Sequence, residues 1–250
     1  MRQLETSVRV PRLYLPAPLR VGQVIELPPA QSHHLRRVLR LRLSEPLALF
    51  NGGALEYSGR VVAMGRTLVS VAIDAEQAVN SESPLAITLA QALSRAERMD
   101  FTIQKSVELG VQRLVPLLTE RSVVRFKDKR RPRRMEHWSK IIIGACEQSG
   151  RLGLPELQEP KPFPEWITQP RLGSKLMLDP GASLSFATIT SAEPEILLLV
   201  GGEGGFCQRE RDQAKEAGFI GVHLGPRVLR TETAALVAVS LLQSRFWDLT

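Results

Sequence analysis

The sequence is poor in cysteine, with two such residues among 250, Cys146 and Cys207. Their wide separation gives neither a disulfide framework nor the close spacing of a zinc site, and it fits a reducing compartment. No apolar run approaches the ~20 residues of a membrane-spanning helix, and the first residues lack the apolar core of a signal peptide. We therefore expect a cytoplasmic protein without a metal site.

The chain also lacks the two common glycine motifs of nucleotide-binding proteins. A dinucleotide-binding loop needs Gly-x-Gly-x-x-Gly and an acid about 20 residues later. Counted from Gly202, the third glycine position holds Cys207, and the next predicted strand ends near His223. A phosphate-binding P-loop closes with Gly-Lys and then Ser or Thr, whereas Phe206 follows the glycines here. Both classes of nucleotide site are therefore excluded.

Two glycine-bearing turns are the most informative feature that is present. The sequence GGEGG at 201–205 follows the apolar run 196–200, and LGPRVLRTET at 224–233 follows the apolar run 219–223. Short runs of branched residues bounded by glycine predict buried strands. Because open α/β sheets bind ligands at the carboxyl ends of their strands, we predict one small-molecule site built largely from the backbone of these turns.

The net charge of +7 is concentrated in one segment. Residues 121–140 hold nine Lys or Arg against two acids, so this segment carries as much net charge as the whole chain. A second group of arginines lies near the N-terminus: Arg36, Arg37, Arg40 and Arg42. Clustered basic residues are typical of proteins that bind a polyanion such as RNA, although a basic loop can also serve solubility alone.

The chain divides into two predicted domains joined by a polar linker at residues 77–83. Residues 1–76 predict a small β-rich domain, with strands at 8–10, 23–27, 47–50, 55–62 and 67–71 and a helix at 32–41. Residues 84–250 alternate strands with helices, which predicts an α/β domain with a mostly parallel sheet covered on both faces. Its strands are expected at 85–90, 114–118, 175–178, 197–200 and 220–224, and its helices at 99–109, 132–148, 208–217 and from residue 231.

The last predicted helix is apolar around its whole circumference at 234–242. A helix of this kind must be buried on all sides. It is therefore either central to its own domain or shared with a second subunit.

Several motifs lie in order along most of the chain. They are HHLRRVLR at 33–40, MDFTIQK at 99–105 with VELGV at 107–111, PLLTERSVV at 116–124, EQSGR at 147–151, GGEGGF at 201–206 and LGPRVLRTETAA at 224–235. Together they resemble the motifs of the small-subunit ribosomal RNA uridine-N3 methyltransferases, which belong to the SPOUT class of S-adenosylmethionine enzymes.

This resemblance implies a PUA-like RNA-binding β-barrel in residues 1–76 and a methyltransferase domain with a deep trefoil knot in residues 84–250. It also implies a homodimer with the last helix at the interface. S-adenosylmethionine would be the cofactor, and 16S ribosomal RNA in the assembled small subunit would be the substrate. Two alternatives stay open: a non-catalytic RNA-binding assembly factor, and a knotted methyltransferase acting on another position such as ribose 2′-O or guanine N1.

The resemblance assigns the cofactor to both turns and to a preceding strand end. The implied cofactor-binding residues are Leu178, Val200, Gly201, Gly202, Glu203, Gly204, Leu224, Gly225, Arg227, Leu229, Thr231 and Thr233. Methylation at uridine N3 requires loss of its proton, so Arg230 and Arg227 are candidates to stabilise the anion. Glu232 is assigned to catalysis with them, and Glu203 or Glu232 is a candidate base. Thr231 as an N-cap and Glu232 beside the helix dipole could instead have structural roles alone.

RNA contacts are expected from basic residues of both domains: Arg12, His33, His34, Arg36, Arg37, Arg40, Arg121 and Arg125. Two positions depart from the family pattern. Cys207 stands where a serine usually caps the helix after GGEGGF, which predicts a weaker start of that helix. Gly202 replaces a proline, which predicts a more flexible turn.

Overall fold

The computed structural model describes residues 10–122, 131–190 and 193–246. The chain forms two compact units, residues 1–81 with 146–153 and residues 82–145 with 154–250. Because residues 146–153 belong to the first unit, no single cut in the sequence separates the two. The predicted boundaries of 1–76, 77–83 and 84–250 therefore stay a proposal.

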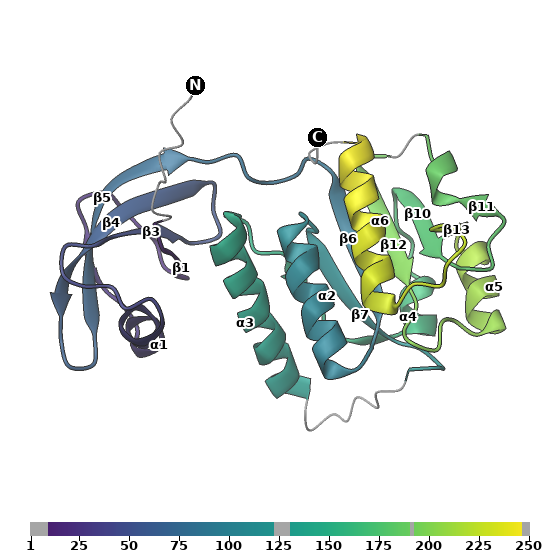
Figure 1. The fold of residues 1–250 in the computed structure, drawn as a ribbon, viewed down its shortest axis with the longest axis horizontal. Helices are drawn as coiled ribbons and strands as arrows, with labels where there is room; N and C mark the ends of the chain where they lie inside the picture. Colours follow the sequence, from purple (N-terminus) through teal and green to yellow (C-terminus); the bar gives the residue numbers. More distant parts are fainter. Residues whose placement is uncertain (1–9, 123–130, 191–192, 247–250) are drawn as a thin grey trace. The chain divides into compact units, whose positions relative to one another are not determined.

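The first unit is built on a five-stranded sheet in the order β1-β3-β4-β5-β2 (Figure 1). β1 pairs with β3 in parallel, and the other neighbours pair antiparallel. A turn at 51–53 joins β3 to β4, and Gly52 has the positive φ of 90° that suits glycine. The elements are β1 (Arg12–Tyr14), β2 (Val24–Glu26), α1 (Pro29–His33), the π-helical η1 (His34–Val38), β3 (Pro46–Phe50), β4 (Leu55–Met64) and β5 (Val69–Ala78).

Two sequence predictions for this unit differ from the structure. β5 runs to Ala78, so the first two residues of the predicted linker extend the β4–β5 hairpin; they are polar or small because this end of the strand is exposed. The helix covers residues 29–38 rather than 32–41. Pro29 starts it, and Arg40 has a positive φ of 55°, which does not continue a helix. Residues 8 and 9 of the first predicted strand lie outside the described residues.

The second unit contains an eight-stranded sheet in the order β11-β13-β10-β12-β6-β7-β8, with β9 beside β7. All its strand pairs are parallel, which confirms the predicted sheet type. The strands are β6 (Ala86–Ala92), β7 (Arg113–Leu118), β8 (Glu156–Leu157), β9 (Lys161–Pro162), β10 (Ser174–Leu178), β11 (Leu184–Ser185), β12 (Glu195–Val200) and β13 (Ile220–His223). The helices are α2 (Ala96–Glu108), α3 (Arg131–Ser149), α4 (Phe163–Ile167), the 3₁₀ turn η3 (Phe186–Thr188), α5 (Gln208–Glu216) and α6 (Thr231–Phe246).

Helices cover both faces of this sheet. Phe163 and Trp166 of α4 join Leu197 and Leu199 of β12 in one apolar cluster, which α5 also contacts through Ala214. α2 and α6 pack side by side, and α6 contacts β6 and β12 (Figure 1). Since side chains alternate between the faces of a strand, these two helix pairs bury opposite sides of the central strands. The trefoil knot stays a prediction.

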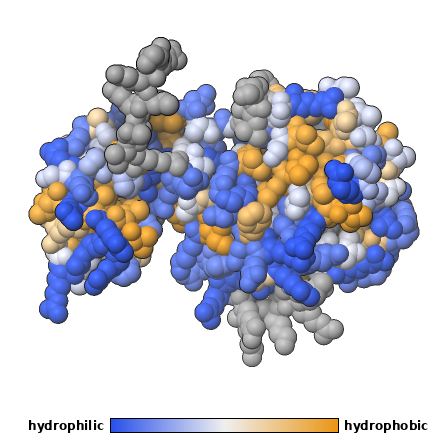
Figure 2. Space-filling model, in the orientation of Figure 1, coloured by the Kyte–Doolittle hydropathy of each residue, from blue (hydrophilic) through white to orange (hydrophobic). Residues whose placement is uncertain are grey.

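α6 is buried along only part of its surface. Ala235, Ala238, Val239 and Leu242 are buried, whereas Leu241 is 44% exposed. Figure 2 shows apolar surface over this helix. In the single chain α6 is therefore not enclosed on all sides by its own domain, and burial shared with a second subunit stays a proposal.

Candidate functional site

A pocket of about 360 Å³ opens at the carboxyl ends of β10, β12 and β13 and at the start of α6. This is the edge of a parallel sheet at which ligands bind in open α/β folds, and its volume lies in the ~300–1,000 Å³ range of small-molecule sites. Its lining consists of Arg98, residues 178–180, 200–203 and 205–206, Arg211, residues 222–225 and 227–231, and Ala234. We call residues 201–205 loop A and residues 224–230 loop B.

Glycine is required in both loops by the path of the backbone. A Cβ on Gly204 would lie 3.0 Å from the Arg121 Cβ and 3.2 Å from its carbonyl oxygen. Gly225 in loop B has a φ of 108°, which side chains rarely permit. The glycines therefore let loop A pack closely and let loop B turn sharply, and both loops present backbone to the pocket.

Hydrogen bonds beside the pocket join loop A to Thr231, the residue that directly follows loop B. The Thr231 hydroxyl donates to the carbonyl oxygen of Gly201, and Gln91 Nε2 donates to Thr231 Oγ1 at 2.9 Å. Thr231 is the first residue of α6, so its hydroxyl bonds to loop A rather than acting as the predicted N-cap from outside the helix.

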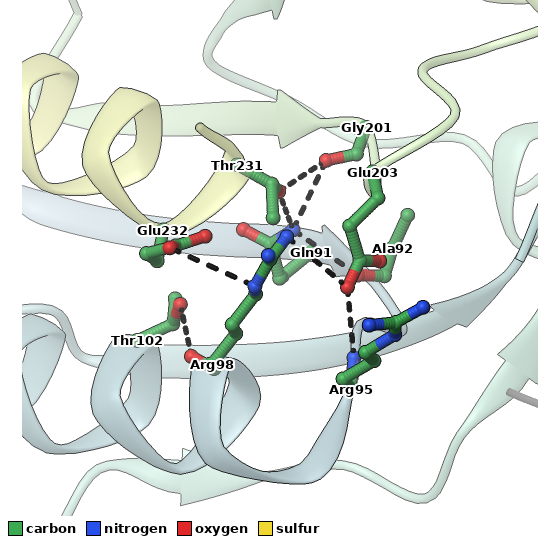
Figure 3. A network of polar contacts seen from close by, with 9 residues as sticks. All are labelled: Gln91, Ala92, Arg95, Arg98, Thr102, Gly201, Glu203, Thr231 and Glu232. Atoms are coloured by element: carbon green, nitrogen blue, oxygen red, sulfur yellow. Dashed lines mark hydrogen bonds and ion pairs between the residues drawn. The ribbon is translucent and has the colours of Figure 1, made fainter. Parts of the chain in front are cut away.

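A charged cluster lies next to these contacts (Figure 3). Arg98 of α2 has Nη1 at 3.5 Å from Glu203 Oε1 and Nε at 3.9 Å from Glu232 Oε1. Glu203 Oε1 also accepts the backbone N–H of Arg95 at 3.2 Å. Among the described residues, the second carboxylate oxygens of Glu203 and Glu232 are buried without a hydrogen-bond partner. The cluster therefore joins loop A, α2 and α6, and one oxygen of each carboxylate can still accept a hydrogen bond.

Arg227 and Arg230 of loop B differ from the other arginines of the pocket. Both are exposed, and within the part of the chain that the structure describes their side chains form no hydrogen bond or ion pair. Arg211, by contrast, donates to the Phe206 carbonyl oxygen at 2.8 Å and lies 4.0 Å from Asp179. Arg227 and Arg230 thus present free positive charge at the pocket.

The predicted cofactor residues converge on this pocket. All of them line it except Gly204 and Thr233, and Arg230 lines it as well. Glu232 does not line it but contacts Arg98, which does. Four polar residues of the lining were not predicted from the sequence: Arg98, Asp179, Arg211 and His223. Asp179 and His223 lie at the ends of predicted strands, and this position could have identified them as site residues. No feature of the sequence marked Arg98 as a site residue.

The helix after loop A begins without the usual serine. Glu210 accepts the backbone N–H of Cys207 at 2.9 Å and that of Glu120 at 2.8 Å. The buried carboxylate therefore satisfies the start of α5 and ties it to the segment after β7.

In the first unit, His33, Arg37 and Arg40 are exposed, and His34 and Arg36 are half-buried. Arg36 donates to the carbonyl oxygen of Arg66. The exposed members of this cluster stay candidates for RNA contacts.

Arg12 is a correction to the predicted RNA contacts. Its side chain is 9% exposed, with Nε at 2.6 Å from Glu56 Oε2 and Nη1 at 2.7 Å from the Cys146 carbonyl oxygen. Its guanidinium also lies 4.7 Å from the centre of the Phe50 ring. The residue is held inside the first unit, and its partner at position 146 is too distant in sequence to have been foreseen.

Glu147, like the Cys146 carbonyl group, bonds to a residue of β1. It accepts the Tyr14 backbone N–H at 3.0 Å. Burial raises the pKa of its carboxyl, and the Tyr14 hydrogen bond and the nearby His34 partly offset this effect. The motif at 147–151 therefore helps to build the first unit.

Arg121 lies beside loop A, where its Nη1 donates to the Gly204 carbonyl oxygen at 3.3 Å. Arg125 lies outside the described residues. Across the ranges that the structure covers, no group of three His, Cys, Asp or Glu side chains could hold a metal ion, and no described helix has the length and apolar character to cross a membrane.

Comparison with known families gives two matches. Residues 81–243 match the RNA methyltransferase domain family, and residues 27–74 match the PUA domain of RNA methyltransferases. Ribosomal RNA small subunit methyltransferase E of Buchnera aphidicola subsp. Schizaphis graminum is 36% identical over 242 residues, covering 96% of this chain and 98% of that protein. The protein of the same name from Bacillus subtilis is 28% identical over 219 residues, covering 84% and 86%.

Solved structures agree with these relatives. Ribosomal RNA small subunit methyltransferase E of Neisseria gonorrhoeae, bound to S-adenosylmethionine, is 40% identical with a TM-score of 0.89, covering 96% of this chain and 100% of that chain. A Legionella pneumophila protein described as a methyltransferase, also with bound S-adenosylmethionine, is 42% identical with a TM-score of 0.92, covering 95% and 98%.

Proposed function

Since this chain belongs to the RNA methyltransferase family that includes ribosomal RNA small subunit methyltransferase E, we propose that it methylates N3 of a uridine in 16S ribosomal RNA. It is an S-adenosylmethionine-dependent ribosomal RNA methyltransferase. The observation that carries the finer proposal is that Arg227 and Arg230 line the pocket and have no side-chain partner among the described residues. The assembly-factor and other-position alternatives have no observation in their favour.

The residues present fit the cofactor. The pocket combines apolar side chains, Leu178, Leu224 and Leu229, with the exposed backbone of two glycine loops. Apolar walls suit an adenine ring, and backbone N–H and C=O groups can bond to its polar edge. The carboxylates of Asp179 and Glu203 also line the pocket and suit the positive charge of a sulfonium or amino group. When bound, S-adenosylmethionine supplies an electrophilic methyl group and needs no metal.

The chain's own residues must prepare the acceptor. Uridine N3 carries a proton at neutral pH, and its removal leaves negative charge on the neighbouring carbonyl oxygens. Arg227 and Arg230 are fixed cations without partners among the described residues, so we assign them to stabilise that anion. Proton removal is assigned to the carboxylate cluster, in which Glu232 and Glu203 each keep one buried oxygen unpaired. Arg98 lies 3.5 Å from Glu203 and 3.9 Å from Glu232, so it holds the two carboxylates close to each other.

The RNA partner is proposed from charge. Exposed Arg37 and Arg40 in the first unit and Arg121 in the second would bind phosphates of the small-subunit RNA. We further propose that the enzyme acts in the cytoplasm as a homodimer in which a second copy covers the exposed part of α6.

Transfer of a radiolabelled methyl group from S-adenosylmethionine tests this proposal. The substrates are small ribosomal subunits purified from cells that lack the modification, and the same RNA stripped of protein. Label in the RNA of the intact subunit supports the assembled particle as substrate. Label only in stripped RNA contradicts that partner, and no label in either contradicts the activity.

A further inference from the structure

Gln91 is a buried polar residue outside the pocket lining. It is 1% exposed and lies near the carboxyl end of β6, where it is paired in register with Val200 of β12. Its place in the sheet puts it directly behind the start of loop A.

Its amide nitrogen contacts loop A and the residue that directly follows loop B (Figure 3). Nε2 donates to Thr231 Oγ1 at 2.9 Å and lies 3.3 Å from the Gly201 carbonyl oxygen, with the Ala92 carbonyl oxygen at 3.1 Å. The Thr231 hydroxyl donates in turn to Gly201. Gly201 opens loop A, and Thr231 directly follows loop B, so one side chain joins the two walls of the pocket.

The side-chain amide of Gln91 does not favour the stability of the fold. Among the described residues, Gln91 Oε1 is buried without a hydrogen-bond partner, which costs folding free energy. An apolar side chain of similar shape would avoid that cost. The value of the amide at this position therefore lies in its two N–H donors and in what they hold together.

We propose that Gln91 is a positioning residue that sets the spacing of loops A and B and so preorganises the cofactor pocket. The inference rests on the proposed function, because it takes S-adenosylmethionine as the ligand of that pocket. The residue touches neither ligand nor RNA; it acts through Gly201 and Thr231, which line the pocket. Preorganisation lowers the ordering cost of binding.

The test compares two buried glutamines of the same unit. Gln91→Leu removes the donors at the pocket. Gln243→Leu is the matched control: Gln243 is fully buried in α6 and bonds to the Leu109 carbonyl oxygen and to Ser83, away from the pocket. The Kd for S-adenosylmethionine is measured by calorimetry, Tm without cofactor by scanning fluorimetry, and exchange of the loop amides by mass spectrometry.

Gln91→Leu is expected to weaken S-adenosylmethionine binding about tenfold and to speed hydrogen exchange in both loops. Gln243→Leu is expected to lower Tm but to keep the Kd within about twofold of wild type. If Gln91→Leu does not fold, Gln91→Met, which also lacks N–H donors and is unbranched, takes its place, and its Kd must weaken similarly.

Gln91→Leu binding within about twofold of the wild-type Kd would overturn the inference, as would an equal loss in Gln243→Leu. A wild-type protein that does not bind S-adenosylmethionine would instead contradict the proposed function itself. The two failures are therefore distinguishable.

Discussion

Arg230 and Arg227 carry the proposed chemistry because they are the arginines of the pocket that the described structure leaves without partners. Arg98 and Arg211 also line the pocket, but carboxylate and carbonyl groups surround them. A guanidinium held by the protein can position loops, whereas a free one can stabilise charge that develops on the substrate. We therefore assign a structural role to Arg98 and Arg211 and a catalytic role to Arg227 and Arg230.

Arg230→Ala should lower kcat about 10²–10³-fold, because it removes one fixed charge at the developing anion. The Kd for S-adenosylmethionine should change little, since the residue is assigned to the acceptor. Arg209→Ala is the control, as Arg209 is an exposed arginine of α5 paired with Glu120 and outside the pocket. Single-turnover methyl transfer and calorimetry measure the two quantities. Equal losses of both would assign Arg230 to cofactor binding, and full activity would remove it from the mechanism.

Most of the pocket lining that loops A and B supply could be predicted from the sequence. Loops A and B are contiguous, so their glycines and arginines could be read from the sequence and from its family resemblance. Gln91 and Arg98 could not be found in this way, because their partners at 201–203 and 231–232 become neighbours only after the sheet is assembled. Arg12 was misassigned for the same reason: a basic residue of an RNA-binding domain is buried against residues 146–151.

Among the elements, length decided what could be predicted. Long helices such as α2 and α3, and the central strands β6 and β12, have enough residues to show an apolar pattern. The two-residue strands β8, β9 and β11 are too short to show any period, and the five-residue α4 follows a strand with no turn between them. Their existence depends on neighbours in the sheet, which sequence periodicity does not contain.

α6 is more apolar than its burial within one chain requires, because part of its apolar surface is exposed. Leu241→Glu should convert a dimer to monomers, because Leu241 is 44% exposed and a charge there would be buried at a subunit interface. The monomer should remain folded, since the position is exposed in the isolated chain. Leu184→Glu, at 47% exposure on β11, is the matched control and should leave the dimer intact. Sedimentation velocity measures both; a dimer that survives Leu241→Glu would place the interface elsewhere.

For the whole molecule, the basic segments and the pocket are suited to two different ligands. The net charge of +7 falls mainly on residues 121–140, and the first unit adds exposed arginines next to its helix. The pocket itself is lined by apolar side chains, by two glycine-bearing loops and by charged residues of both signs: Arg98, Asp179, Glu203, Arg211, Arg227 and Arg230. We therefore expect attraction to RNA and capture of the cofactor to depend mainly on different residues.

Arg37→Gln with Arg40→Gln should weaken binding to small-subunit RNA and reduce the slope of log K against log salt by up to about 2, one for each phosphate that is no longer neutralised. The Kd for S-adenosylmethionine should not change. Arg60→Gln is the control, because Arg60 is also exposed on the first unit but is paired with Asp74. Fluorescence anisotropy over a salt series gives the slope. An unchanged slope would return these arginines to a role in solubility.

The most direct test of the account is the identity of the methylated nucleoside. Small ribosomal subunits lacking the modification are incubated with the protein and S-adenosylmethionine, and the digested 16S ribosomal RNA is examined by mass spectrometry. We expect N3-methyluridine in the digest of the wild-type reaction and its loss with Arg230→Ala. A methyl group on a ribose 2′-oxygen or on guanine N1 would contradict the assigned acceptor. Absence of any methylated product, from a protein that binds the cofactor, would contradict the methyltransferase activity.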